Sequence, residues 1–310
     1  MHALLEVKNL VKKFGTFLAV NDISFVVNEG EIVGLLGANG AGKTITIQML
    51  LTALTPTSGS INYFGLDLAT HRSEILQHVA FASTYIKMPG NISIYNNLDI
   101  YARLYGIAEQ ERKKIIEKYL CIFGMWHMRH KPVGLLSAGQ TTRTMLAKAF
   151  LTNPRIILLD EPTASLDLEV ALEVRALILE QRREHNCTVL ITSHNMEEVA
   201  AVCDRVLVLQ RGSLIANDTP TRLAAAFNQT RVELVIEHDK DQERACVYAQ
   251  NHALSYQLTA RTFVARIDEH KIATLLKDFA ALSIEYSSIT IDKPTFEDYF
   301  LSMTHRKQRP

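Results

Sequence analysis

Short apolar runs alternate with polar and glycine-containing stretches along the first 228 residues of the chain. Residues 32–37, 156–159 and 188–192 are rich in Ile, Leu and Val, and each run is followed by glycine or polar residues. Runs of this length predict buried strands. Residues 44–54 are longer and predict a helix directly after the first of these strands. The pattern therefore indicates an α/β fold for residues 1–228.

The pattern changes in residues 229–310. Alternating residues predict a strand near 231–238, and a polar-apolar helical pattern follows it. One or two further strands, a second helix, another strand and a short C-terminal helix complete the order. The order β-α-β-β-α-β predicts a small α+β domain of the ferredoxin-like type. We take it as a dimerisation or regulatory domain, with a passive stabilising extension as the equal alternative.

Charge, cysteine spacing and apolar runs limit which partners and locations the sequence predicts. The 310 residues include 33 basic and 33 acidic side chains, so the net charge is zero and we expect no nucleic-acid partner. The four cysteines lie far apart in the sequence and lack a metal-ligand spacing. Glu6 and Lys8 interrupt the apolar N-terminal stretch, which excludes a signal peptide, and no run is typical of a membrane-spanning helix.

Residues 37–44 have the pattern G-x-x-x-x-G-K-T between a predicted strand and a predicted helix. This is the context in which a P-loop binds nucleotide phosphates. Glycines let backbone N–H groups approach phosphate oxygens, and the following helix adds the positive end of its dipole. Lys43 is placed for the β- and γ-phosphates, and Thr44 for Mg²⁺.

Polar residues follow two other predicted strands. Asp160 and Glu161 come directly after the run 156–159, where Asp160 can hold Mg²⁺ and Glu161 can polarise an attacking water. His194 follows the run 188–192 and could contact a γ-phosphate, although a lone histidine there is more often structural. Ser137 precedes a predicted helix, and by itself it is best explained as a helix cap.

Taken in order, these segments resemble the nucleotide-binding subunit of an ABC transporter over residues 4–222. Residues 37–44 match Walker A, 136–140 the signature motif, 156–161 Walker B and 164–167 the D-loop. His194 matches the switch histidine, and Phe14 matches the aromatic residue that stacks on adenine. The resemblance places the following residues around the nucleotide: Phe14, Gly37, Ala38, Asn39, Gly40, Ala41, Gly42, Lys43, Thr44, Ile45, Ser137, Gly139, Gln140 and Asp167.

The resemblance implies a P-loop NTPase of the ABC ATPase cassette type. It has a helical subdomain at about 85–150, of which 85–135 docks a separate transmembrane permease subunit. It also implies ATP and Mg²⁺ as ligands, Glu161 and His194 as catalytic residues, and a head-to-tail homodimer with two ATP molecules in the interface. Such a subunit would lie at the cytoplasmic face of the bacterial inner membrane. The C-terminal residues 293–306 resemble the ATPase subunits of ABC-2 exporters.

Three positions depart from the family pattern. Ala138 stands where a glycine is usual in the signature, and Ile45 replaces a usual hydroxyl residue. Thr84 occupies the position of the Q-loop glutamine, whose side chain reaches Mg²⁺ and reports nucleotide state to the membrane partner. We expect a weaker or water-mediated link at Thr84. A non-transport ABC-type ATPase acting on ribosomes or DNA, and an importer ATPase, are the alternatives to an exporter.

Overall fold

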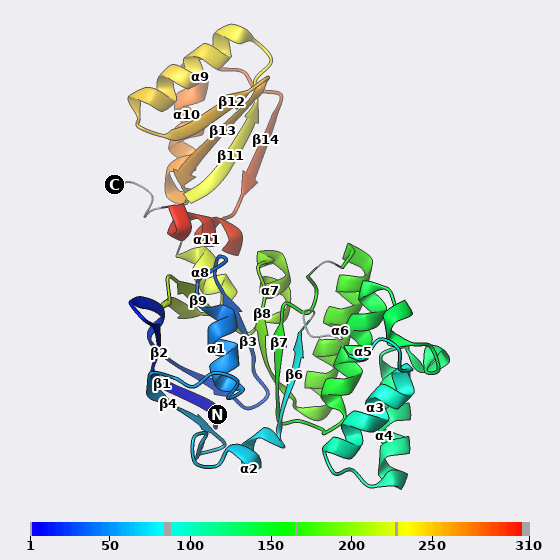
Figure 1. Ribbon diagram of the computed structural model, residues 1–310. Helices are drawn as coiled ribbons and strands as arrows, with labels where there is room; N and C mark the ends of the chain where they lie inside the picture. Colours follow the sequence, from blue (N-terminus) through cyan, green and yellow to red (C-terminus); the bar gives the residue numbers. More distant parts are fainter. Residues whose placement is uncertain (1, 84–87, 165, 227–228, 306–310) are drawn as a thin grey trace. The chain divides into compact units, whose positions relative to one another are not determined.

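The computed structural model describes residues 2–83, 88–164, 166–226 and 229–305. The chain divides into two compact units, Met1–Thr219 and Pro220–Pro310 (Figure 1). The sequence pattern predicts the division at residue 228. The units divide earlier because helix α8 (Pro220–Ala225) packs with helix α11 (Phe296–His305) inside the second unit.

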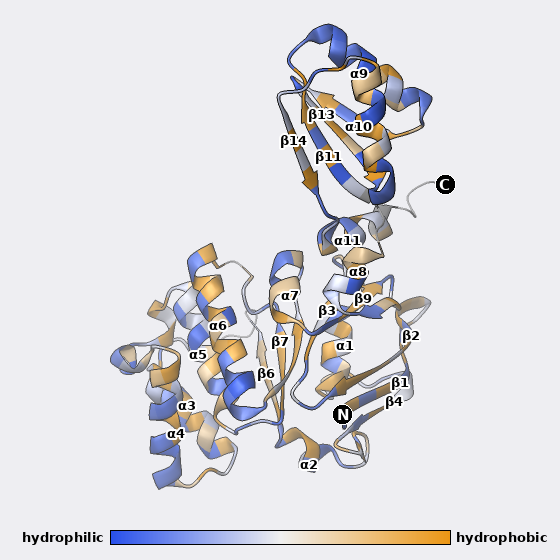
Figure 2. Ribbon diagram, turned by 180° about the vertical axis from the view of Figure 1, so that it is seen from behind, coloured by the Kyte–Doolittle hydropathy of each residue, from blue (hydrophilic) through white to orange (hydrophobic). Residues whose placement is uncertain are grey.

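A six-stranded sheet forms the centre of the first unit, in the order β10-β9-β3-β8-β7-β6. All neighbouring strands are parallel except β9 and β10. Its strands are β3 (Ile32–Leu36), β6 (Val79–Ser83), β7 (Ile156–Asp160), β8 (Thr188–Thr192), β9 (Arg205–Gln210) and β10 (Ser213–Asp218). Every residue of β3, β7 and β8 is buried, which confirms the predicted buried strands. Figure 2 shows the hydrophobic residues concentrated along this sheet.

A second, antiparallel sheet has the order β2-β1-β4-β5. Its strands are β1 (Ala3–Phe14), β2 (Phe17–Asn28), β4 (Ser58–Tyr63) and β5 (Leu66–Asp67). Leu5 and Val27 of this sheet share one hydrophobic core with Leu35 of β3 and Leu50 of helix α1 (Lys43–Leu50). The core therefore holds α1, and the loop that precedes it, between the two sheets.

Helices α3, α4 and α5 group together beside β6 (Figure 1). Tyr119 of α4 and Phe123, which directly follows this helix, both stack on Phe150 of α5, with ring centroids 5.7 and 5.8 Å apart. This group falls in the segment predicted as a helical subdomain. The helices of the unit are α1, α2 (Arg72–Leu76), α3 (Ile94–Leu104), α4 (Glu109–Ile122), α5 (Ala138–Phe150), α6 (Leu168–His185) and α7 (Met196–Val202), with short 3-10 turns at Trp126–Met128 and Val133–Leu135. Within the described part of the chain, no helix has both the length and the apolar character to cross a membrane.

The second unit has its elements in the predicted order: β11 (Gln229–Val235), α9 (Asp239–Asn251), β12 (Ser255–Thr259), β13 (Thr262–Asp268), α10 (Ile272–Ala281) and β14 (Ser288–Asp292), before α11. The strands form one sheet, β12-β13-β11-β14, in which all neighbours are antiparallel. One face packs Val232, Leu234 and Phe263 against Tyr248 of α9 and Phe279 of α10. We keep the ferredoxin-like sandwich as the proposed description of this unit.

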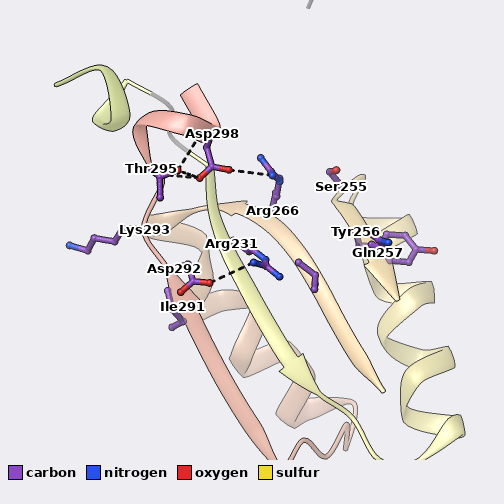
Figure 3. A pocket seen from close by; sticks show the side chains of 11 residues that line it. Arg231, Ser255, Tyr256, Gln257, Arg266, Ile291, Asp292, Lys293, Thr295 and Asp298 are labelled. Atoms are coloured by element: carbon purple, nitrogen blue, oxygen red, sulfur yellow. Dashed lines mark hydrogen bonds and ion pairs between the residues drawn. The ribbon is translucent and has the colours of Figure 1, made fainter. Parts of the chain in front are cut away.

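The opposite face of this sheet carries a polar pocket (Figure 3). Arg231 and Arg266 are direct cross-strand neighbours, and like charges at such positions repel. Arg231 lies 2.8 Å from Glu233, and Arg266 lies 3.3 Å from Asp298 of α11. The two guanidinium charges are therefore compensated by carboxylates of the same unit.

Candidate functional site

The predicted site residues follow neighbouring strands of the parallel sheet. The P-loop follows β3, Asp160 ends β7, and His194 comes shortly after β8. Because the three strands are parallel and adjacent, their carboxyl ends lie at one edge of the sheet. This topology gathers segments that are distant in the sequence.

The P-loop glycines are required by the backbone. Gly42 has φ +106°, and a Cβ there would lie 2.8 Å from the carbonyl oxygen of Ala19. A Cβ on Gly37 would lie 2.5 Å from the carbonyl oxygen of Leu209. Helix α1 begins at Lys43 with no side-chain cap, so its first N–H groups face outward from the helix start. The start of α1 is thus suited to an anion.

Lys43 lies inside this loop and is only 7% exposed. Its Nζ donates hydrogen bonds to the carbonyl oxygens of Gly37 at 2.7 Å and Ala38 at 3.4 Å. Burial lowers the pKa of the Lys43 ammonium, and the nearby carboxylates of Glu161 and Asp160 oppose that shift. The loop carbonyls therefore orient the ammonium group of Lys43 beside the two carboxylates.

The other positions of the loop divide between surface and core. Ala38, Asn39 and Gly40 are exposed, as phosphate-binding backbone must be, whereas Ala41 is buried. Ile45, the departure from the family pattern, packs against the hydrophobic core of the unit. Packing against the core explains why an apolar side chain stands at this position. Such a side chain offers no hydroxyl to a phosphate.

Asp160 and Glu161 are held by one residue of the neighbouring strand. The hydroxyl of Thr192 donates to Oδ1 of Asp160 at 2.6 Å. The backbone N–H of Glu161 donates to the hydroxyl oxygen of Thr192 at 3.0 Å and to its carbonyl oxygen at 3.1 Å. Glu161 has φ +50°, a left-handed conformation that a side-chain-bearing residue rarely adopts and that is often found at functional sites.

Glu161 and His194 face each other. Nδ1 of His194 lies 3.2 Å from Oε2 of Glu161, so an imidazole and a carboxylate meet from segments that follow different strands. The Glu161 side chain is 14% exposed and the His194 side chain 64% exposed. A carboxylate with restricted access to solvent, oriented by a histidine, is the arrangement expected of a group that activates water.

A pocket joins the P-loop to these carboxylates. Asp160, Glu161, Phe17 and Ser83 line it together with the P-loop. Phe14 is the residue that the sequence predicts for adenine stacking, and it stays a prediction, whereas Phe17 is the phenylalanine that lines this pocket. The two phenylalanines are cross-strand partners at the tip of the β1–β2 hairpin, and both rings are exposed. The sequence does show a second phenylalanine three residues after Phe14, which could have been considered for the same role.

The residues at the P-loop fit Mg²⁺ bound together with a nucleotide. Thr44 is exposed at the start of α1, and Asp160 has one carboxylate oxygen bound to Thr192 and a second oxygen available in its carboxylate. The described residues contain no group of three His, Cys, Asp or Glu able to hold a metal by themselves. Mg²⁺ commonly binds through one or two protein groups plus substrate phosphates, so this set is sufficient. Thr84, the third predicted ligand, lies outside the described residues.

The signature residues perform a different task within their own chain. Ser137 caps α5: its hydroxyl accepts from the N–H of Gln140 at 3.3 Å, while the Gln140 side chain accepts from the N–H of Ser137 at 3.1 Å. Gly139 lies against α6, where a Cβ would come within 2.7 Å of Val170. Asp167 caps α6 through the N–H of Val170. The helix-cap interpretation of Ser137 is confirmed, and a role toward nucleotide stays a prediction.

The fold and the site together define a P-loop nucleotide hydrolase. The family model described as "ABC transporter" matches residues 20–164. Bacitracin transport ATP-binding protein BcrA of Bacillus licheniformis is 32% identical over 98% of both chains. Linearmycin resistance ATP-binding protein LnrL of Bacillus subtilis is 27% identical over 99% of this chain and 100% of the relative. The chain belongs to the ABC transporter ATP-binding protein family and is an ATPase.

Solved structures agree with this assignment. CbiO1 from Clostridium perfringens, part of the ABC transporter complex CbiONQ, is 27% identical and superimposes with a TM-score of 0.66. The similarity covers 73% of this chain and 92% of that structure. The predicted ABC ATPase cassette is thereby confirmed.

Proposed function

We propose that this chain is the ATP-hydrolysing subunit of a bacterial ABC exporter, acting as a homodimer on a separate transmembrane subunit. It would bind peripherally at the cytoplasmic face of the membrane. The observation that supports this function best is the convergence of the P-loop, Asp160, Glu161 and His194 at one sheet edge.

The position of the signature residues supports a homodimer. Ser137 caps its own helix, and the pocket at the P-loop is lined by residues from other segments, such as Phe17 and Asp160. A head-to-tail second copy would bring Ser137 and Gly139 onto the nucleotide. Exposed N–H groups at the start of α5, which is 13 residues long, would then face the γ-phosphate.

Each residue at the sheet edge has a role in this proposal. Lys43 and the P-loop amides bind phosphate oxygens, and His194 contacts the γ-phosphate. Glu161 orients and polarises the attacking water. Thr44 and Asp160 would hold Mg²⁺, which neutralises phosphate charge when it is bound.

Export is favoured by the relatives. BcrA is named for bacitracin transport and LnrL for linearmycin resistance, and both match this chain over nearly its whole length. A Nod factor export ATP-binding protein of Burkholderia lata is 34% identical over 71% of the chain. We therefore place this chain with exporter subunits, and ATP-driven closure and opening of the dimer would move the transmembrane partner between two states.

The test uses Glu161→Gln, which should bind ATP without hydrolysing it. With ATP we expect light scattering to show a dimer, and the double variant Lys43→Ala/Glu161→Gln to stay monomeric. From detergent-solubilised membranes of the native host, tagged Glu161→Gln should co-purify a polytopic membrane protein in stoichiometric amount. Ribosomal or DNA-repair proteins in its place would overturn the exporter assignment.

A further inference from the structure

Glu198 is a carboxylate in α7 that is only 1% exposed. It lies outside the P-loop and is neither of the two carboxylates, Asp160 and Glu161, at the end of β7. A charged side chain this deeply buried is costly unless hydrogen bonds and an opposite charge compensate it. The groups that contact the Glu198 carboxylate therefore indicate the role of this buried charge.

The two oxygens of Glu198 bind two different segments of the site. Oε1 accepts a hydrogen bond from the hydroxyl of Thr163 at 2.6 Å, and Oε2 accepts one from the hydroxyl of Ser193 at 2.7 Å. Thr163 lies two residues after Glu161, and Ser193 directly precedes His194. One carboxylate thus ties together the segments that follow β7 and β8.

Other contacts hold Glu198 and Ser193 in place. The N–H of Asn195 donates to the Ser193 hydroxyl oxygen at 3.0 Å, and the N–H of Glu198 donates to the Asn195 side chain at 3.0 Å. These two hydrogen bonds lie within the turn from β8 into α7. They hold the residues on both sides of His194, and thereby restrict its position.

Arg175 of α6 supplies the opposite charge. Its Nε lies 3.6 Å from Oε1 of Glu198, and the Arg175 side chain is 13% exposed. This Nε has no hydrogen-bond partner in the described part of the chain, so the attraction between the charges dominates this pair. One cavity brings the whole group together with the catalytic pair, lined among others by Glu161, Thr163, Arg175, Ser193, His194 and Glu198.

We propose that Glu198 is a positioning residue for ATP hydrolysis, which sets the separation of Glu161 and His194 by holding Thr163 and Ser193 at once. The proposal rests on the roles proposed above for Glu161 and His194. It follows that losing Glu198 changes the chemical step, because the P-loop contacts of Lys43 are made through other segments.

The first variant is Glu198→Gln, which keeps the shape of the side chain. Its amide nitrogen cannot accept the second hydroxyl, and the Arg175 charge loses its partner. We expect kcat to fall by about tenfold or more, since misplacing reacting groups by about 1 Å can cost about 10²-fold. KM for ATP and the Kd for ATP should stay within about twofold, because neither hydroxyl belongs to the P-loop.

Two control variants separate positioning from stability. Glu197→Gln removes the same charge from the neighbouring, exposed position of α7 and should leave kcat unchanged. Glu31→Gln breaks a largely buried pair with Arg205, whose groups lie 2.7 Å apart, within the same unit. It should lower the melting temperature without changing kcat per ATP-bound molecule.

Ser193→Ala gives a second reading if Glu198→Gln folds poorly. We expect it to lower kcat alone, and to have little further effect in a Glu198→Ala background, where the hydrogen bond from Ser193 is already lost. Additive effects, or an unchanged kcat per ATP-bound molecule in Glu198→Gln, would overturn the proposal. If Glu161→Gln itself hydrolysed ATP at the normal rate, the proposed function would fail instead, which distinguishes the two failures.

Discussion

The two units of the chain use charged residues on their sheets in opposite ways. In the first unit the parallel strands β3, β7 and β8 end at one edge, where Lys43, Asp160 and Glu161 meet in one pocket. In the second unit all strands are antiparallel, and Arg231 and Arg266 lie on an open sheet face beside their own carboxylate partners.

The difference shows how strand direction decides what a charged residue can do. Parallel strands align their carboxyl ends, so the loops that follow them converge and can hold a ligand. Antiparallel strands send alternate loops to opposite edges, and their charged side chains meet as cross-strand neighbours. We therefore expect chemistry in the first unit and mainly structural ion pairs on the open face of the second.

The largest effect is expected at Glu161. Glu161→Gln removes the proposed base beside His194 while keeping the size of the side chain, so hydrolysis should fall about 10²–10⁴-fold with ATP binding retained. Phosphate release and nucleotide binding measure the two properties separately. Glu111→Gln, at an exposed position of α4, is the control. A hydrolysis rate within about threefold of the wild-type rate would remove Glu161 from the catalytic role.

A truncation in the core of the second unit should show that the two units unfold independently. Phe279 is fully buried and packs on Tyr248 and Phe263, so Phe279→Ala should destabilise the second unit by about 3–5 kcal/mol. Hydrogen exchange should then rise in β11 and β13, while β3 and β7 keep their protection. Val247→Ala, at an exposed position of α9, should leave both units protected. Loss of protection in both units after Phe279→Ala would show a single cooperative core.

A smaller effect should distinguish the two phenylalanines of the β1–β2 hairpin. Phe17 lines the pocket, so Phe17→Ala should weaken ATP binding by about two- to tenfold through lost ring stacking. Phe14→Ala should have the smaller effect, because the Phe14 ring already contacts Lys12, whose Nζ lies 4.9 Å from the ring centroid. Titration of each variant with ATP decides between them, and a stronger effect at Phe14 would support the residue predicted from the sequence.

The smallest effect is expected on the open face of the second unit. Arg266 and Asp298 are 41% and 30% exposed, so breaking their pair by Arg266→Gln should change the free energy of unfolding by less than about 1 kcal/mol. A double-mutant cycle with Asp298→Asn isolates the pair. A coupling above about 2 kcal/mol would mean that this face is more than a solvated ion-pair surface.

Much of the fold could be predicted because the signals are local. The runs 32–37, 156–159 and 188–192 form buried strands, and the helix after the P-loop begins at Lys43. The order of elements in the second unit was also predicted. The structure divides at Thr219, before the predicted boundary at residue 228, because the division depends on α8 packing with α11, a contact between segments distant in the sequence.

The site was predictable where a motif specifies it. Gly37, Lys43, Asp160 and Glu161 are recognisable from spacing alone, and the structure brings them to one pocket. Glu198 was not recognisable, because a glutamate that follows another glutamate in the first turn of a helix gives no sign of burial. Only the three-dimensional arrangement shows that its two oxygens meet hydroxyls from two separate loops.

Two copies of the chain are proposed to complete each ATP site together, and mixing two inactive variants tests this sharing directly. Lys43→Ala disables the P-loop, whereas Ser137→Asp keeps the cap of α5 and places a negative charge where the partner's γ-phosphate would lie. Ser137→Asn, which caps without charge, is the matched control. Each of the two variants should be inactive alone. Their equal mixture should recover up to about a quarter of the wild-type rate, since random pairing gives mixed dimers with one intact site. Full activity of Ser137→Asp alone, or a mixture no more active than its components, would contradict a shared site.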